Sequence, residues 1–229
     1  MQRVDAPEIL DSDNCSPADV EATLQDLGRV NRWFGGVATT QRMVNRVAQA
    51  SGAKHFSLLE VAAGSGELPE IVRQKLARRG IALDVTLLDL QRSHLPAGES
   101  SIVASALALP FGDDAFDLVS CNLFAHHLNP QQLTQCAREG FRVCRRAVLI
   151  NDLVRHPVHL ALAYAGYPIM RSRVAWLDGL TSVRRAYVPE EIRSILGSAL
   201  SQTAGQVEIS RHYLFRMGAI VWKRPAEHA

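Results

Sequence analysis

The sequence predicts an α/β fold built on a mainly parallel sheet, because short apolar runs typical of strands alternate along the 229 residues with segments of helical periodicity. A glycine-rich turn lies between the first of these runs and a helix, as in open α/β sheets that bind ligands at their carboxyl edge. Two strand-like runs near the end of the chain are separated only by His212 and its neighbours, which indicates an antiparallel pair at one edge of the sheet.

Two N-terminal helices, 17–27 and 37–50, are expected before the first strand, separated by VNRWFGG with its glycine pair. The core is then expected to run through strand 56–62, helix 67–79, strand 83–89, strand 101–104, strand 116–121, helix 130–143 and strand 147–151. Residues 153–187 are too long for an ordinary strand-to-helix connection, so we expect them to form a helical cap inserted after the fifth strand. A helix opened by Pro189 and strands 206–211 and 213–222 complete the fold.

We therefore expect an N-terminal helical lid over residues 1–52 and a class I, Rossmann-like core over 53–229, with the cap at about 153–187. The net charge is only +2 and both signs are mixed along the chain, which argues against nucleic acid as a partner. The polar N-terminus and the absence of an apolar run of about 20 residues predict a cytoplasmic protein that does not insert into membranes. The four cysteines lack metal-binding spacing and are expected to be free thiols.

The segment SLLEVAAGSGELP carries the first chemical signal. Gly64 and Gly66 would let the backbone approach a ligand closely, and the helix that follows offers free N–H groups to an anion. Asp89 ends the next strand, where a carboxylate can accept both hydroxyls of a ribose. The dinucleotide pattern GxGxxG does not fit, because Pro69 stands where its third glycine would be, and this argues against a nicotinamide cofactor.

EVAAGSG, LLDL and ALALPFGDDAFDLVSCNLFAHHL occur in the order found in the class I S-adenosylmethionine (SAM)-dependent methyltransferases, and the chain resembles that family, of methyltransferase type 11/12, over about residues 30–225. The resemblance implies SAM as cofactor and S-adenosylhomocysteine (SAH) as product. It implies that the methionine part of SAM is surrounded by Glu60, Ala62, Gly64 and Gly66, the ribose by Asp89 and Leu90, the adenine by Ser105 and Ala106, and the sulfonium by Asn122. Ala62 replaces the usual first glycine of the family, and Ser105 replaces an aspartate that many relatives use for the adenine amino group.

The segments VNRWFGG, LFAHHL, NDLVRHP and SVRRAYVPEE resemble a bacterial subgroup associated with phenolic polyketides and quinones. This resemblance implies a small aromatic acceptor that is methylated on oxygen. Trp33 and Phe34 are then candidates for a lid over the site, and His156, Tyr164 and Trp176 of the cap are candidates for substrate contacts. Each of these five could equally serve only to pack the helices together.

Methyl transfer from SAM needs alignment, exclusion of water and deprotonation of the acceptor. A phenol with a pKa of about 10 gains from a base poised near neutrality, and histidine suits this task best. His126 and His127 follow the fourth strand and are the candidate bases, with His126 placed first, and Asp152 could orient a histidine or take the proton. Structural roles for all three stay open. The fourth strand ends in SCN rather than in an acid, so no metal is expected.

Three other functions stay open from the sequence. Carbon methylation of a quinol ring would use the same fold and the same deprotonation. A SAM-binding partner protein could keep the cofactor pocket without catalysis, which the changes at Ala62 and Ser105 would allow. A nicotinamide-dependent oxidoreductase is disfavoured by the missing third glycine and by the C-terminal antiparallel pair.

Overall fold

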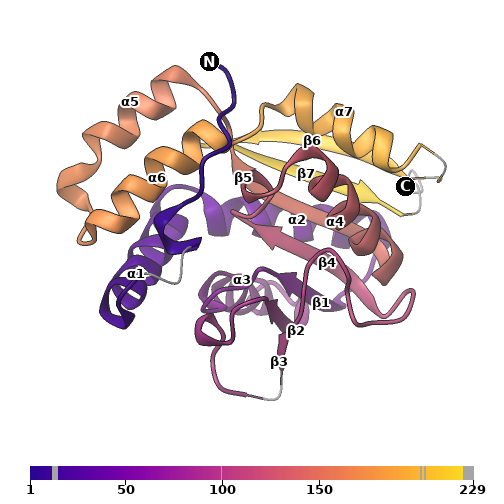
Figure 1. Ribbon diagram of the computed structural model, residues 1–229. Helices are drawn as coiled ribbons and strands as arrows, with labels where there is room; N and C mark the ends of the chain where they lie inside the picture. Colours follow the sequence, from indigo (N-terminus) through magenta and orange to yellow (C-terminus); the bar gives the residue numbers. More distant parts are fainter. Residues whose placement is uncertain (12–14, 99, 202, 204, 224–229) are drawn as a thin grey trace.

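The computed structural model describes residues 1–11, 15–98, 100–201, 203 and 205–223, which form one seven-stranded sheet with helices on both faces (Figure 1). The strands are β1 (His55–Val61), β2 (Ala82–Asp89), β3 (Ser101–Val103), β4 (Phe116–Asn122), β5 (Cys144–Leu153), β6 (Gln206–His212) and β7 (Arg216–Trp222). Their order is β3-β2-β1-β4-β5-β7-β6; β1 to β5 pair in parallel, and β7 is antiparallel to both β5 and β6. This mainly parallel sheet with an antiparallel C-terminal strand confirms the predicted α/β fold class.

The α-helices are α1 (Pro17–Trp33), α2 (Gly36–Ser51), α3 (Glu67–Ala77), α4 (Pro130–Val143), α5 (Pro157–Ala165), α6 (Arg173–Arg185) and α7 (Pro189–Ala199). Short 3-10 turns are η1 (Ile9–Asp11), η2 (Arg92–His94), η3 (Ala125–His127) and η4 (Tyr167–Ile169). Apolar side chains of α2 and α3 pack on one face of the sheet, and those of α4 and α7 pack on the other. Figure 1 shows α1, α5 and α6 grouped together beside the sheet.

The start and the packing of α4 illustrate how local sequence sets these elements. The Asn129 side chain accepts the N–H of Gln132, while the Gln132 side chain accepts the N–H of Asn129, so a capping box begins the helix. Inside the helix, a Cβ atom on Gly140 would lie 3.2 Å from a methyl group of Val148, and glycine therefore lets α4 lie close to β5.

The predicted cap is helical, since α5, η4 and α6 occupy most of residues 153–187. It is tied to the N-terminal helices, because the buried Asp26 carboxylate of α1 accepts the backbone N–H groups of Arg171 and Ser172 at the start of α6. None of the described helices combines the length and the apolar character that a transmembrane span requires.

Three predicted elements have wrong boundaries, and one of them is the strand predicted over 147–151, which runs from Cys144 to Leu153. Helix α1 continues to Trp33 instead of ending near residue 27, because the break falls at Gly35 alone, whose φ of 83° stops the helix. The last strand begins at Arg216 rather than at residue 213, because Leu214 and Phe215 adopt positive φ values of 49° and 60° in the turn after β6.

Candidate active site

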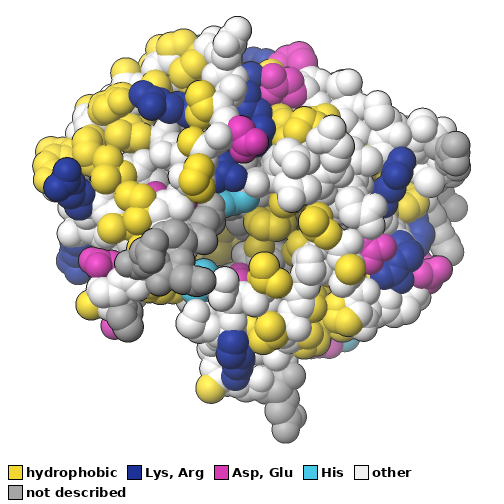
Figure 2. Space-filling view, viewed as in Figure 1, with side chains coloured by type: hydrophobic (Ala, Val, Ile, Leu, Met, Phe, Trp, Pro, Cys, Tyr) yellow, Lys and Arg dark blue, Asp and Glu magenta, His cyan; other side chains and the backbone are white. Residues whose placement is uncertain are grey.

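The loops after β1, β2, β3 and β4 surround a cavity of about 1210 Å³, at the carboxyl edge of the sheet. Figure 2 shows the hollow in the middle of this face, with histidine side chains beside it. The residues predicted to act in the site that do line this cavity are Ala62, Gly64, Asp89, Leu90, Ser105, Ala106 and His127. Glu60, Gly66 and Asn122, which were also predicted to contact the cofactor, are not among the residues that line the cavity.

The turn after β1 requires unusual backbone geometry. Ala62, Gly64 and Gly66 have φ values of 53°, 54° and 70°, in the left-handed region that favours glycine. A Cβ atom on Gly66 would lie 2.5 Å from Leu87 Cδ1, so a side chain there would also clash with β2. This turn places the N-terminus of α3 beside the cavity, where its free N–H groups can face an anion.

The Asp89 carboxylate lies at the end of β2 and lines the cavity. Its Oδ2 accepts the N–H of Gly64 at 2.9 Å, and its Oδ1 accepts the N–H of Gln91 at 3.0 Å. Burial alone would raise the pKa of Asp89, but hydrogen bonds from His94, Gln91 and Gly64 outweigh it and hold the pKa below its usual value. Asp89 is therefore an ionised acceptor that is fixed in position near the glycine turn.

The Glu60 carboxyl group is buried at the end of β1. Its Oε1 accepts the side-chain N–H of Asn122 at 2.7 Å, and within the described part of the chain its buried Oε2 has no hydrogen-bond partner. Burial raises the pKa of Glu60 to about 7. A buried acceptor without a partner costs free energy, so this oxygen suits a ligand donor such as a cationic amino group.

The Asn122 side chain belongs to a buried hydrogen-bond network that the sequence did not predict. The Oδ1 atom of Asn122 accepts hydrogen bonds from Thr40 of α2 at 2.5 Å and from the Asn151 amide at 2.8 Å. Arg216 of β7 donates to Asn151 Oδ1 at 3.3 Å and to Asn31 Oδ1 at 2.8 Å, and burial lowers the pKa of Arg216 to about 10. The network links the N-terminal helices α1 and α2 to the strands β4, β5 and β7.

His126 is held between two carboxylates and is only 2% exposed. Its Nδ1 lies 2.7 Å from Asp152 Oδ1, its backbone N–H donates to Asp152 Oδ2 at 2.9 Å, and its Nε2 lies 3.4 Å from Glu8 Oε1. Burial alone would lower the pKa of His126, but Asp152 and Glu8 raise it to about 9. Burial alone would raise the pKa of Asp152, but its contacts with His126 lower it. The structure thus pairs the Asp152 carboxylate with the buried His126 through two hydrogen bonds.

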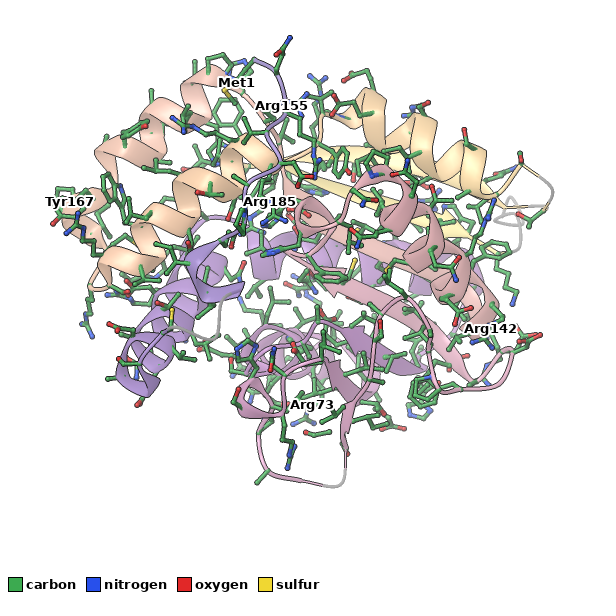
Figure 3. All side chains as sticks on the ribbon, viewed as in Figure 1. Met1, Arg73, Arg142, Arg155, Tyr167 and Arg185 are labelled. Atoms are coloured by element: carbon green, nitrogen blue, oxygen red, sulfur yellow. The ribbon has the colours of Figure 1, made fainter. Side chains whose placement is uncertain are left out.

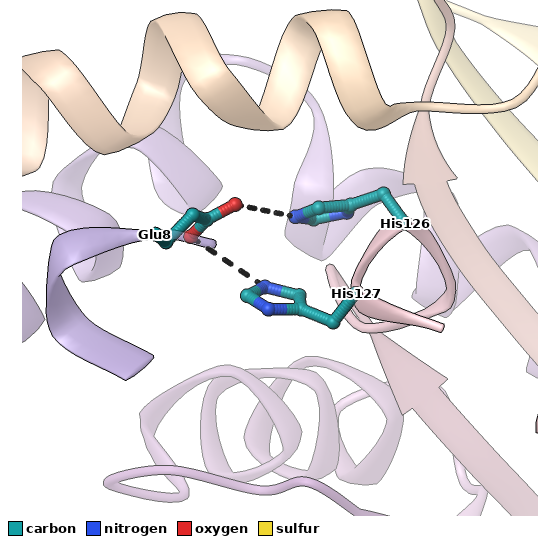
Figure 4. A group of neighbouring side chains, drawn as sticks. All are labelled: Glu8, His126 and His127. Carbon is teal, nitrogen blue, oxygen red and sulfur yellow. Dashed lines mark ion pairs between the residues drawn. The ribbon is translucent and has the colours of Figure 1, made fainter. Parts of the chain in front are cut away.

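His127 differs from its neighbour, because it lines the cavity and its side chain is 22% exposed. Its Nε2 lies 3.6 Å from Glu8 Oε2 (Figure 4). Its ring is stacked near that of Phe124, with centroids 6.2 Å apart. Burial alone would raise the pKa of Glu8, but the two histidines and Ser182 lower it. Glu8 lies far from both histidines in the sequence, and no local pattern indicated its role.

Arg185 fixes the turn that carries the two histidines. From α6 its guanidinium donates to the backbone carbonyl of His126 at 3.2 Å and to that of His127 at 2.8 Å. Figure 3 labels Arg185 near the centre of the molecule, between α6 and the strand ends. The cap therefore supports η3 through the backbone.

Glu8, His126 and His127 are also the group in the described part of the chain with the spacing of metal ligands, since one ligand atom from each lies within 4.8 Å of the others. Two imidazoles and a carboxylate are ligands that zinc accepts. The ion pairs described above already account for this arrangement, and the expectation of a metal-independent reaction stays a prediction.

The five residues predicted to bind substrate are Trp33, Phe34, His156, Tyr164 and Trp176, and although all lie in the described part of the chain, none lines the cavity. Trp33 is 60% exposed at the end of α1. His156 caps the start of α5 by accepting the N–H of Val158, and Trp176 donates to the Ala163 carbonyl and so holds α5 against α6.

The contacts of His156 and Trp176 thus hold the cap helices in place, while Tyr164 is 47% exposed. The N-terminal contribution to the cavity comes instead from Leu10, Cys15, Val20, Glu21, Leu24 and Gln25. Val20 and Leu24 are four residues apart on α1 and so share one face of that helix. The longer course of α1 explains the difference, because the N-terminal half of the helix faces the cavity and Trp33 lies at its far end.

Comparisons with known proteins find a matching domain family and solved structures with the same fold. Residues 59–150 match the family model of a methyltransferase domain. No curated protein is similar to the chain in sequence. The plantazolicin methyltransferase BamL, solved with a triazolic desmethylPZN analogue and SAH, is similar in structure with a TM-score of 0.65 at 10% identity, over 91% of this chain and 98% of that one.

Two further solved structures share the fold. Human N-acetylserotonin methyltransferase in complex with SAM has a TM-score of 0.59 at 13% identity, over 91% of this chain and 57% of that one. A SAM-dependent methyltransferase from Aquifex aeolicus has a TM-score of 0.53 at 13% identity, over 91% and 99%.

The seven-stranded sheet with its antiparallel C-terminal strand is the class I methyltransferase fold. Residues 59–150 within this fold match a methyltransferase domain, and this match supports SAM-dependent methyl transfer.

Proposed function

We propose that the cavity binds SAM beside a small phenolic, polyketide or quinol acceptor, and that the enzyme methylates a hydroxyl group of this acceptor. One observation carries the proposal: a single cavity is lined on one side by the ribose candidate Asp89 and on another by the base candidate His127. Its volume of about 1210 Å³ exceeds the roughly 300–1,000 Å³ of ordinary ligand pockets, which leaves room for cofactor and acceptor together.

In this proposal, Asp89 accepts the ribose hydroxyls, and Ser105 and Ala106 lie along the adenine. The Ser105 hydroxyl already accepts the N–H of Leu107 at 3.2 Å, so Ser105 would shape the adenine loop rather than replace the aspartate of many relatives. Glu60 Oε2 would accept the amino group of the methionine part, because it is a buried oxygen without a partner in the described structure. A cationic amino group there would lower the pKa of Glu60 from about 7 and so favour its charged form.

His127 takes the proton of the acceptor hydroxyl in the proposed reaction. The freed oxygen attacks the methyl carbon of SAM in line with the sulfur, the S–CH₃ bond breaks, and its electron pair stays on sulfur to give SAH. The Glu8 carboxylate would stabilise the resulting imidazolium, and the buried pair of His126 and Asp152 would hold the turn in place. His127 is preferred over His126 as base, because His126 is buried and has carboxylates near both ring nitrogens.

Titration calorimetry with SAM, SAH and NAD tests the cofactor side of the proposal. We expect SAM and SAH to bind and NAD not to bind, and Asp89→Ala to weaken SAM binding by about 5- to 150-fold, the equivalent of about 1–3 kcal/mol. Asp84→Ala is the matched control, since Asp84 lies on the same strand but is exposed. An unchanged dissociation constant in Asp89→Ala would remove Asp89 from the ribose site.

Activity is expected to persist after dialysis against a chelator, as the sequence-based expectation of no metal requires. Loss of turnover that zinc or magnesium restores would instead assign Glu8, His126 and His127 to a metal centre. The metal content of the purified protein, measured by mass spectrometry, checks the same point without an activity assay.

Carbon methylation of a quinol ring remains the rival reaction, because deprotonation by His127 would activate the ring carbon as well as the oxygen. Labelled methyl SAM and NMR of the product separate the two, since O-methyl and ring C-methyl groups have different chemical shifts. In either case we expect the protein to act in the cytoplasm.

A further inference from the structure

Helix α5 and the turn η4 expose an unusual run of apolar side chains. The exposed members are Val158, Leu162, Tyr164, Tyr167 and Ile169, which we call the α5 face; each is 47–53% exposed. Within the described structure, α5 buries none of its own residues. Figure 2 shows hydrophobic side chains gathered over α5 and α6, and Figure 3 labels Tyr167 at the outer edge of the molecule.

The underside of α5 is firmly held, so the exposed side is presented in a defined orientation. The Trp176 indole donates to the Ala163 carbonyl at 3.1 Å and packs edge-on against Tyr167, with ring centroids 4.8 Å apart. His156 and His159 stack on Phe215, with centroids 4.8 and 5.3 Å apart. A fixed apolar surface of this kind in a folded protein marks an interaction site.

The charges around the α5 face are basic. Residues 156–177 contain no aspartate or glutamate, while Arg171 and Arg173 are exposed just after η4. The exposed Arg184 of α6 donates from Nη2 to the Tyr164 hydroxyl at 3.0 Å, which places a third guanidinium against the face.

Among the acids near these arginines, Asp5 is exposed and follows Val4, whose N–H donates to the Arg184 carbonyl at 3.3 Å, while two others are buried. Asp26 is buried beneath the start of α6 and accepts two backbone N–H groups there. Asp178 of α6 is also buried and accepts the N–H groups of Ile9 and Leu10. Both carboxylates thus face inward, and the outer surface presents apolar side chains beside guanidinium groups.

We propose that the α5 face docks on a membrane surface that contains anionic lipids, an activity separate from methyl transfer. Apolar side chains can enter the boundary between head groups and acyl chains, tyrosines suit that boundary, and arginines pair with anionic head groups. A second copy of the chain fits less well, because a two-fold pairing through this face would bring arginines against arginines.

Flotation of the full chain with vesicles tests this proposal. We expect binding to vesicles of phosphatidylcholine mixed with phosphatidylglycerol, weak binding to phosphatidylcholine alone, and release as salt is raised. The double variant Arg171→Gln/Arg173→Gln should weaken binding to the mixed vesicles by about 30-fold at low salt, since each basic group near such a surface contributes a factor of about five.

Ile169→Glu tests the contribution of the apolar side chains to membrane binding, and Val103→Glu is its control. Both residues are 52% exposed, but Val103 lies on the edge strand β3, away from α5 (Figure 1). Ile169→Glu should weaken binding by at least about tenfold, while Val103→Glu should bind as the unmodified protein does. SAM binding by calorimetry checks that all variants are folded. Failure to float, equal flotation with both kinds of vesicle, or a dimer that Ile169→Glu dissociates would each overturn the proposal.

Discussion

His127→Ala should lower turnover by about 100-fold or more, because a general base typically contributes that much to proton transfer. SAM affinity should stay within a factor of about two, since His127 is not among the residues assigned to the cofactor. The measurement is steady-state turnover with an accepted phenol or quinol, together with calorimetry of SAM.

His156→Ala provides the comparison for this variant. His156 is an exposed histidine that caps α5 outside the cavity, so its loss should leave turnover close to that of the unmodified enzyme. Equal turnover of His127→Ala and the unmodified enzyme would exclude His127 as base. Loss of SAM binding in His127→Ala would assign the residue to the cofactor instead.

Asp152→Asn should destabilise the protein by about 3–5 kcal/mol at pH 6, because it removes the closer of the two carboxylates that hold the buried His126 imidazolium and leaves only Glu8, at 3.4 Å. Asp84→Asn is a close control, since Asp84 Oδ2 lies at the same 2.7 Å from the His55 ring but both side chains are exposed. The exposed pair should contribute less than about 1 kcal/mol. Urea unfolding of both variants measures the difference.

The buried pair of His126 and Asp152 also makes the stability of the protein depend on pH. The folded pKa of His126, about 9, lies above the unfolded value of 6.5, so the folded state binds one more proton between these two values. The stabilisation from this group is complete below pH 6.5 and is lost as the pH rises through about 9, at about 1.4 kcal/mol per pH unit.

The destabilisation by Asp152→Asn should therefore shrink as the pH rises toward 10. Unfolding free energies of the unmodified protein and the variant, measured at pH 6 and pH 9.5, provide the check. A difference that stays constant with pH would show that His126 is neutral in the folded protein, and its bond to Asp152 would then be an ordinary neutral hydrogen bond.

Local sequence was sufficient to predict most of the fold, and seven of the predicted site residues line the cavity. Alternation of apolar runs with helical periodicity predicted a mainly parallel sheet, and the glycine turn together with Asp89 indicated its carboxyl edge. These features follow the ends of consecutive strands, so that Gly64 and Asp89, 25 residues apart, meet at the ends of the neighbouring strands β1 and β2. Strand neighbours of this kind meet whenever a parallel sheet forms.

The surroundings of His126 and His127 were decided by contacts between distant segments. Glu8 reaches His126 and His127 across more than 100 residues of chain, and Arg216 reaches Asn151 from the last strand, so no local pattern contained either contact. The sequence by itself determined the sheet, the turn and the candidate residue types. Only the tertiary structure decided which histidine lines the cavity, because burial depends on how the N-terminal segment and the cap pack over η3.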